Sequence, residues 1–278
     1  MPAKPNSPPS ERSAETRQRI LDAALREFAA NGLAGARTEA IATAAGVNKA
    51  LLYYYFDSKE KLYVAALEMI AGRVRDNTMA VFLREATPGE RVLRTALNHF
   101  DRVIAQQEFQ SLMQQEMIRF HKGEPGAMPV LIKKVFEPVM VMYRSMVREG
   151  IASGELIDTD WMQIQLASLG ANVLYFLSAP VLRATLGEDP LTREAISQRR
   201  RILVEFLGQA IFVDRPRGAE LAAKVYGDTP MPEVTLPDST VGKNLAARVL
   251  ADAPRPEIWN HQDRTEEARN EESKGRKK

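Results

Sequence analysis

Cysteine is absent from this chain of 278 residues, and histidine occurs only three times. Without a thiol the chain cannot form a disulfide, hold a metal through thiolates or use a cysteine nucleophile. The sequence also lacks a glycine-rich phosphate loop, and its histidines do not have the spacing of a catalytic triad or a metal site. These absences argue against an enzyme, and no cofactor is expected.

Long hydrophobic runs are missing as well. The first residues, MPAKPNSPPSERS, lack the apolar core of a signal peptide, and no later stretch approaches the roughly 18 uninterrupted apolar residues of a membrane span. We therefore expect a cytoplasmic protein without a membrane partner. The chain is long enough to bury one large hydrophobic core or two smaller ones.

Neither sign of charge is in clear excess, because 38 Lys and Arg residues face 36 Asp and Glu residues. The formal net charge of +2 does not by itself indicate a nucleic-acid partner. Any affinity for DNA has to come from the local placement of basic side chains.

Apolar residues recur at helical spacing from about residue 11 to residue 213, whereas alternating strand patterns of any length are missing. The sequence therefore predicts an all-α protein. In the first predicted helix, Ile20, Ala24 and Phe28 share one face, and Asn31-Gly32 is typical of a C-terminal cap. Later helices are predicted to start at Ser58 and Thr87, and to stop at 150–154 and at Pro180.

Two short helices must fit within residues 35–58. Thr38 is a candidate N-cap for the first of them, and Ile41 and Ala42 follow on one face. Gly46 suits a tight turn with positive φ, and the small Ala42 lets a second helix cross closely. This spacing is typical of a helix-turn-helix motif.

The second short helix presents polar residues at its start. Leu51 and Leu52 are expected to pack against the first helix, which leaves Asn48, Lys49 and Ala50 exposed. In a helix-turn-helix these positions face base edges in the major groove, where an Asn amide can pair with adenine and a Lys with guanine. The alternatives are that Asn48 only caps the helix and that Lys49 is an ordinary solvated lysine.

The segment from Thr38 to Leu62 follows a recognisable pattern. In order and without gaps it contains Thr38, Ile41-Ala42, Ala45-Gly46-Val47, Leu52-Tyr53-Tyr54-Tyr55-Phe56 and Ser58-Lys59-Glu60-Lys61-Leu62. In these residues it resembles the DNA-binding domain of the TetR family of transcriptional repressors. With residues 16–32 similar to the family's first helix, the resemblance covers about residues 14 to 67.

The resemblance implies roles for the matched positions. Tyr53 and Phe56 would pack inward, Tyr54 and Tyr55 would lie along the groove edge, and Lys59 would offer its ammonium group to a phosphate. Arg37 is either a further phosphate contact or a solvated loop arginine. The implied DNA-binding residues are Arg37, Thr38, Asn48, Lys49, Ala50, Tyr54, Tyr55 and Lys59.

The region after residue 67 carries no comparable motif, and in the TetR family it is the variable ligand-binding and dimerisation domain. The segment 161–178 is apolar nearly all round, which a surface helix of a monomer could not be. Paired with 191–213 and with the same two helices of a second copy, it would form a homodimer interface.

Methionines and aromatic residues at helical spacing indicate a possible ligand cavity, although such residues are more often plain core. The candidate ligand-binding residues are Phe100, Met113, Met117, Phe120, His121, Phe136, Met140, Tyr143 and Trp161. Further polar candidates for orienting a ligand are His99, Gln114, Arg119 and Gln163. A metal site built on His99 and His121 is only weakly indicated.

These patterns divide the chain into a flexible N-terminal arm (1–13), a helix-turn-helix domain (14–62), a helical effector-binding and dimerisation domain (63–213) and a mostly flexible tail (214–278). The tail is rich in proline and poor in apolar residues, although GKNLAARVLAD within it could form a short helix.

The leading hypothesis is a dimeric regulator, in particular a repressor, that binds a palindromic DNA operator and is released by a small apolar or amphipathic effector. The alternative is a DNA-binding dimer that responds to no ligand and acts as an architectural factor. The presence or absence of an internal cavity discriminates between the two.

Overall fold

The computed structural model describes residues 9–233, and within them the chain is helical without strands, so the predicted all-α class is confirmed. The helices are α1 (Pro9–Gly35), α2 (Thr38–Ala45), α3 (Lys49–Phe56), α4 (Lys59–Phe82), α5 (Pro88–Ala105), α6 (Gln107–His121), α7 (Met128–Leu131), the π-helical turn η1 (Ile132–Phe136), α8 (Glu137–Ala152), α9 (Trp161–Leu186), α10 (Arg193–Ile211) and α11 (Arg215–Asp228). The described residues form a main unit, 9–173 with 199–233, and a second unit, 174–198.

The first helix begins earlier than the sequence suggested. Residues 9–13 are already helical, which corrects the flexible arm predicted over 1–13, and residues 1–8 lie outside the described part. Pro9 opens the helix because proline, which lacks an N–H, is tolerated in a first turn. The predicted break at Asn31-Gly32 is confirmed, since Gly32 leaves the helical conformation at φ 65°.

Helices α2 and α3 form the expected pair around Gly46. This glycine has φ 66°, and its N–H bonds to the carbonyl of Thr43 at 3.1 Å, which ends α2. Fully buried Ile41 and Leu52 join Phe28 of α1 in one hydrophobic core. The predicted N-cap at Thr38 is wrong, because Arg37 holds that position without a side-chain cap and Thr38 is the first helical residue.

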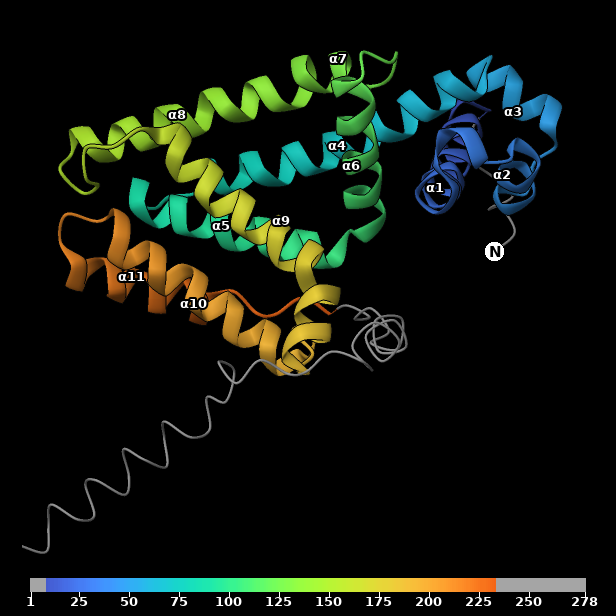
Figure 1. Ribbon diagram of the computed structural model, residues 1–278. Coiled ribbons are helices and arrows are strands. Elements are labelled where there is room, and N and C mark those ends of the chain that lie inside the picture. The colour runs from blue at the N-terminus through green and yellow to red at the C-terminus, as the bar shows by residue number, and fades with distance from the viewer. Residues whose placement is uncertain (1–8, 234–278) are drawn as a thin grey trace, which may run out of the picture. The chain divides into compact units, whose positions relative to one another are not determined.

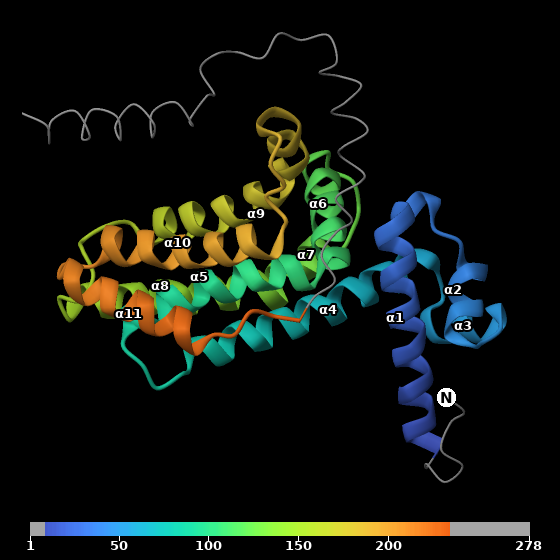
Figure 2. The same cartoon turned by 90° about the horizontal axis from the view of Figure 1, so that it is seen from below.

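Helix α4 connects this core with the rest of the main unit. Ser58 caps it by accepting a hydrogen bond from the amide of Lys61 at 3.1 Å, as the sequence predicted. Its first turns pack against α1, and its later turns pack against α5 and α8 (Figure 1). Figure 2 shows α1 crossing α4 steeply near the start of α4. A single helix of 24 residues therefore belongs to both hydrophobic regions.

The boundary predicted at residue 214 is also wrong, because residues 215–228 form α11. Asp214 caps this helix by accepting from the amide of Arg217 at 3.0 Å. Gly208 of α10 and Gly218 of α11 lie so close that a Cβ at Gly208 would be 2.5 Å from the carbonyl oxygen of Gly218. These long-range contacts order a segment whose own composition is polar. Residues 234–278, including GKNLAARVLAD, lie outside the described part.

Pro180 does not end its helix as predicted, because α9 continues to Leu186. A proline inside a helix removes one backbone hydrogen bond without necessarily ending the helix. Within the second unit, Arg183 donates to Asp189 at 2.6 Å, and Tyr175 donates to the carbonyl of Pro190. These bonds hold the turn between α9 and α10.

Candidate nucleic-acid interface and internal cavity

The start of α3 presents three exposed residues, Asn48, Lys49 and Ala50. Asn48 is the N-cap, and its Oδ1 accepts from the amide of Leu51 at 2.7 Å. This cap fixes the Asn48 side chain but leaves its Nδ2 donors available. Burial of Leu52 and Phe56 on the opposite face holds the exposed residues outward.

Lys49 already has a partner on the neighbouring helix. Its Nζ forms an ion pair with Oε1 of Glu39 and lies 5.9 Å from the centre of the Tyr53 ring. The hydrogen bond from Lys49 lowers the pKa of the Glu39 carboxyl, and the same bond raises the pKa of Lys49. Lys49 can therefore reach a base only by leaving Glu39.

The four consecutive rings of α3 take different positions. Phe56 is buried under Arg17, whose guanidinium lies 5.2 Å from the ring centre. The half-buried Tyr53 lies with its hydroxyl 3.4 Å from the Oγ1 of Thr38, and the hydroxyl of Tyr55 lies 3.0 Å from the Oγ of Ser13.

Tyr54 differs from the other three, since it is 80% exposed. Its ring makes an edge-to-face contact with the Tyr55 ring at a centroid distance of 5.6 Å, and its hydroxyl forms no hydrogen bond with residues 12–233. Of the four rings, Tyr54 is the one that can contact a large partner without first breaking an internal hydrogen bond.

Two further basic residues flank the helix pair. The Nζ of Lys59 donates to the carbonyl of Ala34 at 3.1 Å and forms no ion pair with a carboxylate of residues 12–233. Arg37 is exposed, and its backbone N–H donates to Glu27 at 3.0 Å. Lys59 is also the first residue of α4, where the helix dipole adds partial positive charge.

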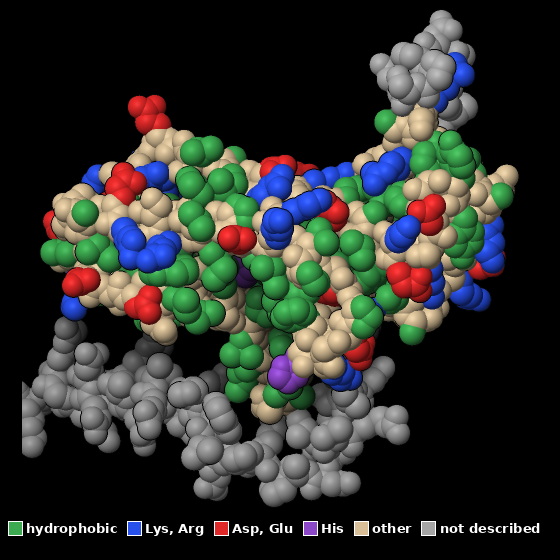
Figure 3. Space-filling model, turned by 90° about the horizontal axis from the view of Figure 1, so that it is seen from above, with side chains coloured by type: hydrophobic (Ala, Val, Ile, Leu, Met, Phe, Trp, Pro, Cys, Tyr) green, Lys and Arg blue, Asp and Glu red, His purple; other side chains and the backbone are tan. Residues whose placement is uncertain are grey.

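Charge over the rest of the molecule is mixed. On the face that carries α8, Lys and Arg side chains alternate with Asp and Glu among hydrophobic ones (Figure 3). This agrees with the formal net charge of +2. The basic residues Arg37, Lys49 and Lys59, of which none is buried, lie at the starts of α2, α3 and α4, where they can contact an anionic polymer.

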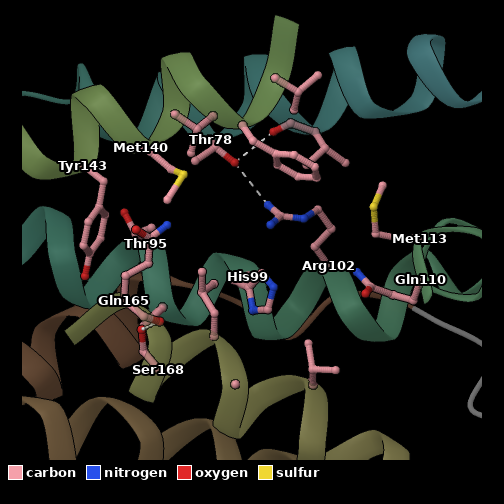
Figure 4. Close-up of a pocket in the computed structure, with 18 of the residues that line it drawn as sticks. Thr78, Thr95, His99, Arg102, Gln110, Met113, Met140, Tyr143, Gln165 and Ser168 are labelled. Atoms are coloured by element: carbon pink, nitrogen blue, oxygen red, sulfur yellow. Dashed lines mark hydrogen bonds between the residues drawn. The ribbon is translucent and has the colours of Figure 1, made fainter. Parts of the chain in front are cut away.

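An internal cavity of about 460 Å³ lies in the main unit, between α4, α5, α6, α8 and the start of α9. Its wall is mostly apolar (Figure 4). Five of the residues named from the sequence line it, namely Met113, Met117, Phe136, Met140 and Tyr143. These five residues come from α6 and from the consecutive segments η1 and α8.

Four other named residues are not part of this wall. Phe100 is fully buried elsewhere in the core, and Trp161 lies at the start of α9, before the part that meets the cavity. Phe120 and His121 are exposed near the end of α6, about one turn beyond Met117. Helical spacing identified the correct face of α6 but not where the cavity ends.

The polar part of the wall was largely missed. His99 was named, whereas Gln114, Arg119 and Gln163 do not line the cavity. The polar side chains that do line it are Thr78, Thr95, His99, Arg102, Gln110, Gln165 and Ser168. Thr95, His99 and Arg102 recur at helical spacing on α5, and that pattern was the available signal.

Burial changes the titration of two of these groups. It lowers the pKa of His99 to about 3, with a contribution from the nearby charge of Arg102. It lowers the pKa of Arg102 to about 10. At neutral pH, His99 is therefore uncharged and Arg102 is a cation. His121 is exposed and does not share this site, and residues 9–233 contain no cluster of three potential metal ligands.

Helix α9 combines a buried polar face with an exposed apolar one. Asn172 is fully buried and donates to the carbonyl of Ala96 on α5 at 3.0 Å. By length and composition alone α9 is apolar enough to cross a membrane, with a mean hydropathy of 1.4 in a window that is 22% buried. Its exposed apolar residues recur at helical spacing and include Leu166, Leu174, Leu177 and Val181.

Two family models match this chain. Residues 20–66 match the one described as bacterial regulatory proteins, tetR family, and residues 88–207 match a tetracyclin repressor-like C-terminal domain. The first match covers most of α1, all of α2 and α3 and the start of α4, and the second runs from α5 into α10.

Curated relatives and solved structures agree with these matches. The transcriptional repressor NicS of Pseudomonas putida is 29% identical over 139 residues, covering 50% of this chain and 65% of NicS. The regulator BetI of Rhizobium meliloti is 41% identical over 76 residues, covering 27% of this chain and 37% of BetI. The chain thus spans less than two thirds of the length of either relative.

A crystal structure of a transcriptional regulator from Saccharomonospora viridis in complex with choline is similar in fold. Its TM-score is 0.57 at 20% sequence identity, over 72% of this chain and 98% of that one. At this identity the similarity concerns the fold alone.

Proposed function

The chain belongs to the tetR family of bacterial transcriptional regulators, and from this premise we propose that it is a dimeric repressor released from a palindromic operator by a small apolar or amphipathic effector. The observation that carries the proposal is the course of α4. Lys59 lies at its first turn, and Val74, Thr78 and Phe82 near its other end line the cavity.

DNA reading is assigned to the start of α3. Asn48, Lys49 and Ala50 face the bases, and Tyr54 lies at the groove edge. Phosphate contacts come from Arg37, Thr38, Tyr55 and Lys59, which fix the position of α3 but do not select sequence. The exposure of Tyr54 and the uncompensated charge of Lys59 support these assignments.

Dimerisation is assigned to α9 and α10. Leu166 of α9 is 58% exposed, and Phe206 of α10 is 67% exposed. Large apolar side chains exposed at helical spacing on two helices are unusual for a monomer and suit a helix-packed interface with a second copy. Two copies would present two α3 helices, and a palindromic operator follows from that symmetry.

Release is assigned to a change in the position of α4. Thr78 lies about 28 Å along the helix from Lys59, at 1.5 Å per residue. A ligand that binds one position of α4 better than another also shifts the separation of the two α3 helices, which must be about 34–36 Å for successive major grooves. Such a regulator works where the DNA is, in the cytoplasm.

The alternative, an architectural factor without a ligand, is less well supported. It provides no role for a cavity of about 460 Å³, which is within the range of about 300–1,000 Å³ of small-molecule sites. The proposal is tested by selecting bound sequences from random DNA and then screening small molecules for release. Recovery of a palindrome and its release by a compound are expected, whereas recovery of unrelated sequences would contradict the proposal.

A further inference from the structure

The wall of the cavity contains a cation without a counter-ion. The Nη1 of Arg102 donates to two neutral acceptors, Oγ1 of Thr78 at 3.2 Å and Oδ1 of Asn98 at 3.1 Å. None of the carboxylates within residues 9–233 forms an ion pair with it. The carboxylate next to it in sequence, Asp101, is taken by Arg200 at 2.6 and 2.9 Å. Arg102 is half-buried, and a charge that is partly removed from water without a partner is costly, so its presence in a cavity wall favours a ligand that balances it.

One edge of this guanidinium is unused. The Nε of Arg102 is buried and bonds to none of the described residues, and the bonds to Thr78 and Asn98 come from Nη1. Nε and Nη2 together form the side-on edge of a guanidinium, whose two parallel N–H groups match the two oxygens of a carboxylate. The described residues thus fix Arg102 through one nitrogen and leave its carboxylate-binding edge without a partner among them.

The imidazole of His99, close to Arg102, provides a second hydrogen-bond donor for a ligand. The Nδ2 of Asn172 donates to the carbonyl of Ala96, an acceptor only, so the orientation of this amide is determined. The same Nδ2 lies 3.3 Å from Nδ1 of His99, so this ring nitrogen must accept. The neutral imidazole then carries its proton on Nε2. Figure 4 shows His99 and Arg102 on α5, both on the side of the helix that lines the cavity.

The remaining wall suits a hydrocarbon. Phe109, Met113, Val135, Phe136 and Met140 line it, and none of the described residues that line it is acidic. A ligand that fills this space needs an apolar body, and a ligand that satisfies the buried donors needs an acceptor head.

We propose that the effector is an amphipathic monoanion, whose carboxylate binds the Nε and Nη2 edge of Arg102 beside the Nε2–H of His99 and whose apolar body fills the cavity between α6 and α8. This inference rests on the proposed function, in which the cavity is the effector site. A single arginine balances one negative charge, so a dianionic phosphate head leaves charge uncompensated. A cationic head meets Arg102 at short range in a poorly solvated site.

The direct test compares four ligands that share a ten-carbon chain and differ in their head group. Decanoate, 1-decanol, decyl phosphate and decyltrimethylammonium are titrated into the full chain by calorimetry, below the concentrations at which they form micelles. Decanoate is expected to bind at least about tenfold more tightly than each of the other three, as expected when a charged hydrogen-bonded pair is lost. Equal binding of decanoate and 1-decanol would overturn the inference, and so would failure of decanoate to bind.

Two variants of the arginine locate the head. R102M is expected to weaken decanoate binding by about ten- to a hundredfold while changing 1-decanol binding by less than about twofold. R102K keeps the positive charge but lacks the two parallel N–H groups of a guanidinium. Its affinity for decanoate is therefore expected to lie between those of the wild type and R102M. R144M removes an exposed arginine of α8 outside the cavity and serves as the matched control. Unchanged decanoate binding by R102M overturns the assignment.

Separate measurements test the anionic effector and the repressor function. Calorimetry reads ligand binding without DNA, whereas retention of the selected operator reads the regulator function. If decyltrimethylammonium releases the operator and decanoate does not, the anionic head is wrong and the repressor proposal stands. If decanoate binds through Arg102 but leaves the operator bound, the binding site is retained and the effector role is lost.

Discussion

The hydroxyl of Tyr63 on α4 donates a hydrogen bond of 3.0 Å to the Oε2 of Glu116 on α6. Both residues are 1% exposed, and the other oxygen of Glu116 accepts from the amide of Met128 at the start of α7 at 2.9 Å. Burial and the Glu116 charge raise the pKa of the Tyr63 hydroxyl. One carboxylate thus joins three helices, at a point on α4 between Lys59 and the cavity.

Removal of this hydroxyl tests how strongly the carboxylate depends on it. In Y63F, Oε2 of Glu116 loses its partner in a buried site, and we expect the free energy of unfolding to fall by about 1–3 kcal/mol. Chemical denaturation measures the change. Y143F is the matched control, because Tyr143 is also buried but its hydroxyl bonds to none of the described residues. Equal losses in the two variants would show that the hydrogen bond to Glu116 adds nothing beyond the loss of a buried hydroxyl.

The ion pair between Glu39 and Lys49 competes with DNA for the lysine. E39Q removes the competing charge, so operator affinity is expected to rise about two- to fivefold, in line with the small strength of exposed pairs. Fluorescence anisotropy with a labelled operator measures it. In the K49A background the same E39Q change should have a smaller effect, since only the general repulsion between Glu39 and DNA is then removed. An equal effect in both backgrounds would show that the effect of Glu39 on operator affinity does not depend on Lys49.

Lys59 and Lys49 are predicted to make different kinds of contact with DNA. K59A should weaken binding to all DNA sequences alike and lower the salt dependence by about one ion, as expected for one lost phosphate contact. K49A should instead change the preferred sequence. Affinities at several salt concentrations, on the operator and on scrambled DNA, separate the two. An unchanged salt slope for K59A argues against its phosphate contact.

His99 is predicted to make stability fall in mild acid. Its pKa is about 3 in the folded chain, against about 6.5 when unfolded, so between these values only the unfolded state takes up the proton. The contribution of His99 to the free energy of unfolding is therefore constant above about pH 6.5. Below that pH it decreases, by up to about 1.4 kcal/mol per pH unit. H99Q should flatten the dependence between pH 6 and 4. H121Q replaces the exposed histidine of α6 and should leave the dependence as in the wild type.

Local signals in the sequence predicted the helix pair well. The signals at Gly46, Ser58 and Leu52 depend on neighbours a few residues away. The structure places the turn at Gly46, the N-cap at Ser58 and the buried side chain of Leu52 as expected. The first helical residue was misjudged at Thr38, because either of two adjacent residues can hold the N-cap. The assignments of DNA and ligand contacts remain predictions.

Features that depend on distant residues could not be predicted. Helix α11 is held by Lys224, which pairs with the buried Glu90 of α5 at 2.9 Å, although they are far apart in sequence. The sequence carries no signal that singles out Arg102, and only the packing of α4, α6 and α8 around it shows a half-buried cation in a cavity wall. The unpaired edge of Arg102 is visible only when all its neighbours are known.

In the proposed mechanism, the cavity and the DNA-binding helices are coupled through α4. By thermodynamic linkage, an effector that weakens operator binding by some factor must itself be bound more weakly by that same factor when the operator is present. The direct test measures operator affinity with and without saturating decanoate, and decanoate affinity with and without saturating operator. We predict two equal factors of about five or more. Factors of one in both measurements, with both ligands bound, would contradict the account.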